Sequence, residues 1–152
     1  MLQLGLSWYL GARVNDSFNL NRFVAAQDKV YSEVCAELKN GLKRSHWMWF
    51  IFPQIKGLGL SEMSRRYSIA SVEEAAAYLE HPVLGPRLRE CTNLVLATEG
   101  RSIHQILGSP DDRKFHSCMT LFASAAPDEP LFRMALAKFF AGVMDDGTLA
   151  QL

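Results

Sequence analysis

The chain has 152 residues, a length typical of a single domain that buries a core without disulfide bonds or a structural metal. Its 16 basic and 16 acidic residues give a formal net charge of zero, which argues against a dedicated nucleic-acid-binding protein with a strongly basic face. No apolar run reaches the about 20 residues of a membrane span, and the N-terminus lacks the basic segment of a signal peptide. We therefore expect a soluble, cytoplasmic protein with no membrane partner.

The cysteines and histidines are too widely spaced to predict a metal site. A zinc site needs closely spaced ligands such as a CxxC pair, and the sequence contains no such pair. We therefore predict free thiols in a reducing compartment, no bound metal and no cofactor. The residues concerned are Cys35, Cys91, Cys118, His46, His81, His104 and His116.

Helix signals begin near residue 15, so we predict an N-terminal extension over residues 1–14 and one domain over residues 15–152. The first predicted helix is entered between residues 16 and 19 and runs to Lys39, with Asp28 as a possible internal cap. Gly41 follows this helix and is suited to the position just after its end. The helix is predicted from an apolar stripe formed by Phe23, Val24, Gln27, Val30, Tyr31, Val34 and Leu38.

A dense aromatic block follows, over residues 47–52. Ser45 lies where the N-cap of a short helix would lie, and Pro53 would end that helix after Trp49 or Phe50. A strand is the alternative, because Trp47 and Trp49 lie on one of two alternating faces that are both apolar. The surrounding helices favour the helical interpretation.

The rest of the chain carries a succession of helix boundaries and no hairpin signal. Serines precede four predicted helices as caps, prolines lie near helix starts, and glycines follow helix ends. We therefore predict an all-α fold: one compact domain of short and medium helices with no extensive sheet. The boundary residues are Ser61, Ser71 with Glu74, Pro86, Gly100, Ser102, Gly108, Ser109 with Pro110, Pro130 and Gly142.

The most informative stretch for function runs from Lys43 to Gln54. If Ser45 caps a helix, the nearby backbone N–H groups and the cations Lys43 and Arg44 converge on one place, which is a suitable site for an anion. His46 could donate to the same anion or transfer a proton. The alternative interpretation is a solvated basic turn that leads into a core-forming aromatic helix.

Further candidate site residues lie on both sides of this turn. Trp47 and Trp49 offer flat faces on which a base or a guanidinium could stack, and Gln54 ends the stretch. Lys114 is predicted to lie near one helical face with other polar residues. Asp111 and Asp112 are acid/base candidates, although paired acids at a helix start more commonly interact with the helix dipole.

Nucleophilic catalysis by Ser45 is not supported by its histidine neighbour. Adjacent residues on a helix point about 100° apart, so Ser45 and His46 do not form a nucleophile–base pair. A triad would require a partner from elsewhere in the chain. The sequence therefore assigns no reaction.

From about Phe18 to Leu152 the chain resembles a family of small, mostly helical proteins of unknown function, some of which carry the label "calpastatin". The resemblance implies an all-helical fold and supplies no activity. We expect the label not to apply, because an inhibitor of that kind would be disordered and rich in proline and lysine. The resemblance rests on Phe23 with Gln27, the run from Lys43 to Gln54 (KRSHWMWFIFPQ), Gly57-Leu58-Gly59, Ser61 with Met63, Tyr67 with Ile69, the run from His81 to Leu88, and Phe122-Ala123.

The chain is also similar in plan to a helical family that hydrolyses N-glycosidic bonds in ADP-ribose-type compounds. The run compared is Lys114-Phe115, which is too short to assign catalytic residues. Three functions are therefore open: binding of a small phosphorylated or nucleotide-like molecule, protein interaction through the tryptophans, and N-glycosidic hydrolysis. We predict a small anionic ligand first and leave the oligomeric state open.

Overall fold

The computed structural model describes residues 16–152, so the extension predicted over residues 1–14 lies outside the described residues. Within this range the chain forms ten helices and no strand, which confirms the all-α prediction. No helix between residues 16 and 152 is both long and apolar enough to cross a bilayer. The helices are α2 (Asn21–Asp28), α3 (Tyr31–Lys39), α4 (Met48–Ile51), α5 (Glu62–Arg66), α6 (Val72–Glu80), α7 (Leu84–Ala97), α8 (Ile103–Leu107), α9 (Asp111–Ala125), α10 (Pro130–Phe140) and α11 (Asp146–Leu149).

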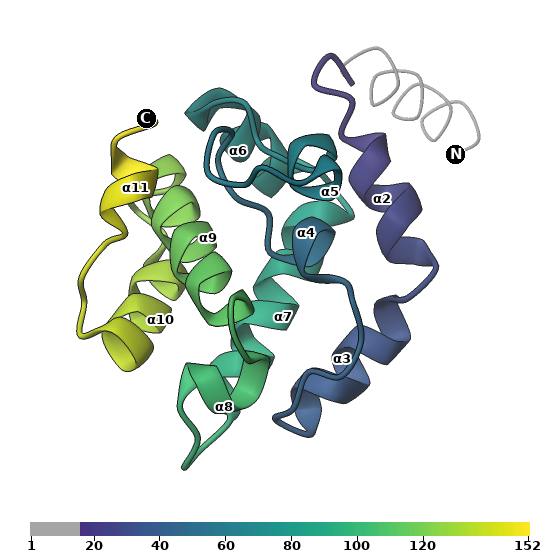
Figure 1. The fold of residues 1–152 in the computed structure, drawn as a ribbon. Coiled ribbons are helices and arrows are strands. Elements are labelled where there is room, and N and C mark those ends of the chain that lie inside the picture. Colours follow the sequence, from purple (N-terminus) through teal and green to yellow (C-terminus); the bar gives the residue numbers. More distant parts are fainter. Residues whose placement is uncertain (1–15) are drawn as a thin grey trace, which may run out of the picture.

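Two helices, α7 and α9, organise the packing (Figure 1). Helix α9 contacts α6, α8, α10 and α11, and α7 contacts α3, α6 and α10. The chain crosses from α5 to α6 beside the loop that follows α4, where Ile55 and Ile69 form an isolated parallel bridge. The Ile69 N–H donates to Gln54 O at 2.8 Å, and the Lys56 N–H donates to Ile69 O at 2.7 Å. This bridge ties the start of the Gly-containing loop, at residues 54–56, to the segment between α5 and α6.

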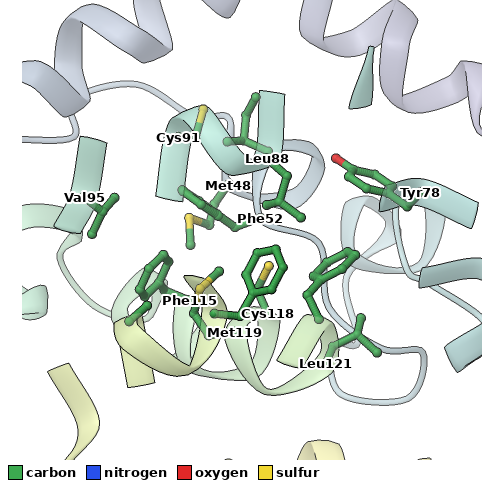
Figure 2. Close-up of a cluster of buried hydrophobic side chains, with 14 of the residues drawn as sticks. Met48, Phe52, Tyr78, Leu88, Cys91, Val95, Phe115, Cys118, Met119 and Leu121 are labelled. Atoms are coloured by element: carbon green, nitrogen blue, oxygen red, sulfur yellow. The ribbon is translucent and has the colours of Figure 1, made fainter. Parts of the chain in front are cut away.

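The aromatic block of the sequence lies in the core. Met48 and Phe52 lie between the side chains of α7, such as Leu88, and those of α9, such as Phe115 (Figure 2). The rings of Phe52 and Phe115 meet edge to face, with their centroids 5.0 Å apart. Trp47 is only 1% exposed. For these residues the alternative interpretation, a core-forming aromatic helix, describes the structure.

The first predicted helix is divided in two. Helix α2 ends at Asp28 and α3 begins at Tyr31, and Val30 stands at the N-cap with a φ of −135° and no side-chain capping bond. Asp28 does not cap α3; its carboxylate pairs with Arg87 at 2.9 Å. The division follows from packing, since α2 contacts α4 whereas α3 contacts α7.

Most of the predicted helix boundaries are confirmed. Gly41 and Gly142 have φ values of +67° and +76° just after α3 and α10. Ser61 accepts the Ser64 N–H at the start of α5, and Ser102 forms a full capping box with Gln105 at α8. Because these signals act within four or five residues of chain, they are readable from sequence.

Three boundary details differ from the prediction. Ser71 accepts the Glu74 N–H as predicted, but the Glu74 carboxylate accepts from the Ala70 N–H and from Arg22, not from Ser71. Pro110, not Ser109, stands at the N-cap of α9, which has no side-chain capping bond. The predicted short tail after α10 contains a helix, α11, whose cap is Asp145.

His81 fixes the start of α7 in a way that depends on its protonation state. Its Nδ1 accepts the N–H groups of Val83 at 3.1 Å and Leu84 at 3.2 Å, which only an unprotonated Nδ1 can do. Burial lowers the pKa of His81 below its usual 6.5, against an opposing effect of Asp16. The folded protein therefore holds this imidazole neutral.

We expect acid to remove the capping contribution of His81. Because its pKa is lower in the folded state, the contribution is complete above about pH 6.5 and is lost as the pH falls through the folded pKa. His81→Asn retains an acceptor that does not titrate, so wild type should lose stability relative to this variant below about pH 6.5. Urea denaturation at pH 5 and pH 8 measures the difference. Parallel pH profiles for the two proteins would contradict this role of His81.

Candidate functional site

The loop before α4 is organised by a carboxylate from the preceding helix. Glu37, in the last turns of α3, is 8% exposed. Its Oε1 accepts the Arg44 N–H at 2.7 Å, the Ser45 N–H at 3.0 Å and the Trp47 indole N–H at 3.0 Å, and its Oε2 accepts the Ser45 hydroxyl at 2.5 Å. Four donors from a run of four residues therefore converge on one side chain.

These bonds stabilise the ionised form of Glu37. Burial alone would raise the pKa of the carboxyl group, but the bonds from the Ser45 hydroxyl, the Arg44 and Ser45 N–H groups and the Trp47 indole outweigh it. The pKa of Glu37 is lowered from 4.5 to about 2. The backbone N–H groups of this loop therefore do bind an anion, as predicted, but the anion is the protein's own Glu37 carboxylate and not an external ligand.

The predicted role of Ser45 as a helix cap is therefore wrong. Helix α4 starts at Met48, its N-cap is Trp47, and no side chain caps it. The Ser45 hydroxyl and N–H are both engaged by Glu37, as is the indole N–H of the buried Trp47. The half-buried Ser45 and the buried Trp47 consequently belong to the framework of the loop, and these groups are not free to bind a ligand.

A hollow with a volume of about 470 Å³ opens on the other side of the same loop. It lies between the loop before α4, the start of α5 and the start of α9. The chain reaches the start of α9 through a cis Ser109–Pro110 peptide bond. The lining residues are Lys43, His46, Met48, Trp49, Ser61, Ser109, Pro110, Asp111 and Lys114.

An ion pair lies in the wall of this hollow. Lys43 Nζ and Asp111 Oδ2 are 2.8 Å apart, and their side chains are 8% and 18% exposed. Lys43 Nζ also donates to Ser45 O at 2.6 Å and lies 5.0 Å from the centroid of the Trp47 ring. The pair joins the start of α9 to the loop before α4.

A second cation lies over the aromatic wall of the hollow. Lys114 Nζ is 5.2 Å from the centroid of the half-buried Trp49 ring, within the range of a cation–π contact. Among residues 16–152, Lys114 makes no ion pair and His46 makes no hydrogen bond through its ring. The hollow thus combines an ammonium group, an imidazole and an indole face.

The sequence model of one protein family, described as "Protein of unknown function (DUF1810)", matches residues 17–152. This chain belongs to that family. The conserved hypothetical protein Rv1873 from Mycobacterium tuberculosis, solved at 1.38 Å, is 55% identical, with a TM-score of 0.89 over 90% of this chain and 98% of that one. No curated protein matches. These comparisons confirm an uncharacterised helical family and give no support to the calpastatin label.

The structure of this DUF1810 chain brings together only part of the predicted site. Of the predicted residues, Lys43, His46, Trp49, Asp111 and Lys114 line the hollow. These residues come from two segments, 43–49 and 111–114, which are more than 60 positions apart in the sequence. No local sequence pattern therefore predicts that they lie together.

The other candidates lie elsewhere. Arg44 is exposed and does not line the hollow. Gln54 lines a smaller hollow of about 150 Å³ beside the loop that contains Gly57. Asp112 pairs with His104, with Oδ2 and Nδ1 3.1 Å apart.

Sequence reasoning missed Glu37, the residue that shapes the site. One signal was present: Glu37 lies three residues after Val34 and beside Leu38, on the stripe that faces the core. A charged residue in that position requires buried partners. Its partners lie in the next loop, which carries several donors.

Proposed function

We propose that the hollow between the loop before α4 and the start of α9 binds a small anionic molecule that is phosphorylated or nucleotide-like. One observation carries this proposal: the Lys114 ammonium group lies over the Trp49 ring and makes no ion pair among the described residues. A phosphate oxygen offers such a cation a charge-assisted hydrogen bond.

The size and lining of the hollow support the proposal. About 470 Å³ lies within the range of about 300–1,000 Å³ typical of small-molecule sites. Trp49 and Met48 provide apolar contact, and His46 provides ring nitrogens that make no hydrogen bond within residues 16–152. An aromatic wall beside a cation suits a ligand that has both a ring and a phosphate.

The two other functions have weaker support. A protein-interaction role depended on exposed tryptophans, whereas Trp47 is 1% exposed and its indole N–H is bonded to Glu37. N-glycosidic hydrolysis requires a carboxylate beside the scissile bond, and within residues 16–152 only Asp111 offers one to the hollow, where it is paired with Lys43. Release of adenine from ADP-ribose during the binding assay would support hydrolysis, because the N-glycosidic bond of ADP-ribose joins adenine to ribose.

Ligand-dependent stabilisation tests the proposed function. We expect a compound from a panel of AMP, ADP-ribose, ribose 5-phosphate and pyrophosphate to stabilise the protein. At about 100 times its dissociation constant the gain is about 2.7 kcal/mol. For a chain of this size that is a rise in melting temperature of about 5–11 °C in a thermal-shift assay. No shift with any compound at millimolar concentration would contradict the proposal.

A matched pair of lysine and arginine variants locates the site. Lys114→Gln removes the cation over Trp49 and should weaken phosphate binding about tenfold, the effect of losing one charge-assisted bond. Arg113→Gln makes the same charge change one residue earlier, on an exposed side chain outside the hollow, and should bind as wild type does. Equal losses in both variants would indicate a general charge effect and not a site at Lys114.

A further inference from the structure

Asp111 and Lys114 have opposite charges and lie one turn apart at the start of α9. Residues three apart on a helix have Cβ atoms about 5–6 Å apart and commonly form ion pairs. These two do not: Asp111 pairs with Lys43 at 2.8 Å, and Lys114 lies over Trp49. Both line the hollow, so it presents an acceptor and a cation side by side.

The Lys43 ammonium orients Asp111 and has little capacity left for a ligand. It bonds to Asp111 and to Ser45 O at 2.6 Å, it lies 5.0 Å from the Trp47 ring centroid, and its side chain is 8% exposed. The Asp111 carboxylate makes no other polar contact with residues 16–152. A carboxylate only accepts hydrogen bonds, so the remaining acceptor sites of Asp111 face the hollow, where water or a donor on a ligand can bind them.

We infer that Asp111 is a specificity-determining residue that selects anions carrying hydroxyl groups close to the phosphate, that is, sugar phosphates and ribonucleotides. This inference rests on the proposed function and narrows its ligand class. A hydroxyl donates to Asp111 while the phosphate accepts from Lys114 one turn away. A phosphate without hydroxyls places its negative charge near the carboxylate and receives no compensating bond.

Isothermal titration calorimetry with AMP and 2′,3′-dideoxy-AMP tests the inference, because the two compounds share the base and phosphate and differ only in the hydroxyl pair. Wild type should bind AMP at least about tenfold more tightly, the effect of a hydrogen bond to a charged group. Asp111→Asn should reduce this ratio to about threefold or less and leave dideoxy-AMP binding unchanged or tighter. Asp112→Asn is the control: its carboxylate faces His104, and its ratio should equal that of wild type.

The outcomes separate the inference from the proposed function. Equal binding of the two nucleotides by wild type, or an unchanged ratio in Asp111→Asn, overturns the role of Asp111 and leaves the phosphate site intact. Absence of binding by both nucleotides and also by ADP-ribose, ribose 5-phosphate and pyrophosphate overturns the site itself. If Asp111→Asn does not fold, the wild-type ratio still decides, because a ratio near one contradicts the inference without any variant.

Discussion

Gly85→Ala is expected to lower the free energy of unfolding by about 3 kcal/mol, a large value for the addition of one methyl group. Gly85 is the second residue of α7, where the helix starts directly against the end of α6. A Cβ at this position would lie 2.1 Å from the Leu79 carbonyl oxygen and 2.9 Å from Arg89 Nη1. The carbonyl belongs to the backbone and already accepts from Arg89 at 3.2 Å, so it cannot yield without moving one helix relative to the other.

Thermal and urea denaturation measure this effect, and Gly147→Ala is the matched control. Gly147 also lies in a helix, and a Cβ there would lie 3.5 Å from Leu58, an ordinary contact. We expect Gly147→Ala to change the free energy of unfolding by no more than about 1 kcal/mol in either direction. For Gly85→Ala the melting temperature should fall by about 6–12 °C. A Gly85→Ala protein as stable as the control would show that α6 and α7 separate at little cost.

The sequence predicts best those features of the fold that depend on interactions between residues close together in the chain. Ser61 and Ser102 were predicted as caps because a serine hydroxyl bonds an N–H three residues away. A restart of the first helix at Asp28 is predicted as a possibility, but α3 begins only at Tyr31 without a side-chain cap, and Pro110 lies at the N-cap of α9 and not at its first helical position. Those features depend on packing between helices, and neighbouring residues do not encode it.

The candidate site illustrates the same limit. Lys43, Arg44, Ser45 and His46 have the composition of an anion site, and that composition suggested an external ligand. The N–H groups of Arg44 and Ser45 instead bind Glu37, which lies on the preceding helix. Lys43 and His46 do line a hollow, but its opposite wall comes from α9. No local pattern joins that wall to the loop.

The loop therefore has two faces with different roles. The inner face carries Trp47 and the donors that bind Glu37, and it fixes the backbone. The outer face carries His46 and, three residues on, Trp49, which line the hollow. Because the inner bonds set the positions of the outer side chains, damage to the Glu37 network should affect both stability and any binding at the hollow.

Glu37→Gln is expected to lower the free energy of unfolding by about 3 kcal/mol at pH 7. The carboxylate is replaced by an amide that has one acceptor oxygen and an NH₂ group, and the NH₂ group faces donors that it cannot bind. The folded pKa of about 2, compared with 4.5 for a free carboxyl, gives a similar size for the contribution of the charge. Urea denaturation of wild type and variant at pH 7 measures the difference.

The pH dependence distinguishes loss of this charge from general disruption of packing. Because the pKa of Glu37 is lowered on folding, its contribution is complete above about pH 4.5 and is lost as the pH falls towards 2. The stability difference between wild type and Glu37→Gln should therefore shrink as the solution is acidified below pH 4.5. Glu33→Gln, on the exposed side of the same helix, should cost no more than about 1 kcal/mol. A Glu37→Gln deficit that stays constant down to pH 3 would mean that packing, and not the four bonds to the carboxylate, holds the loop in place.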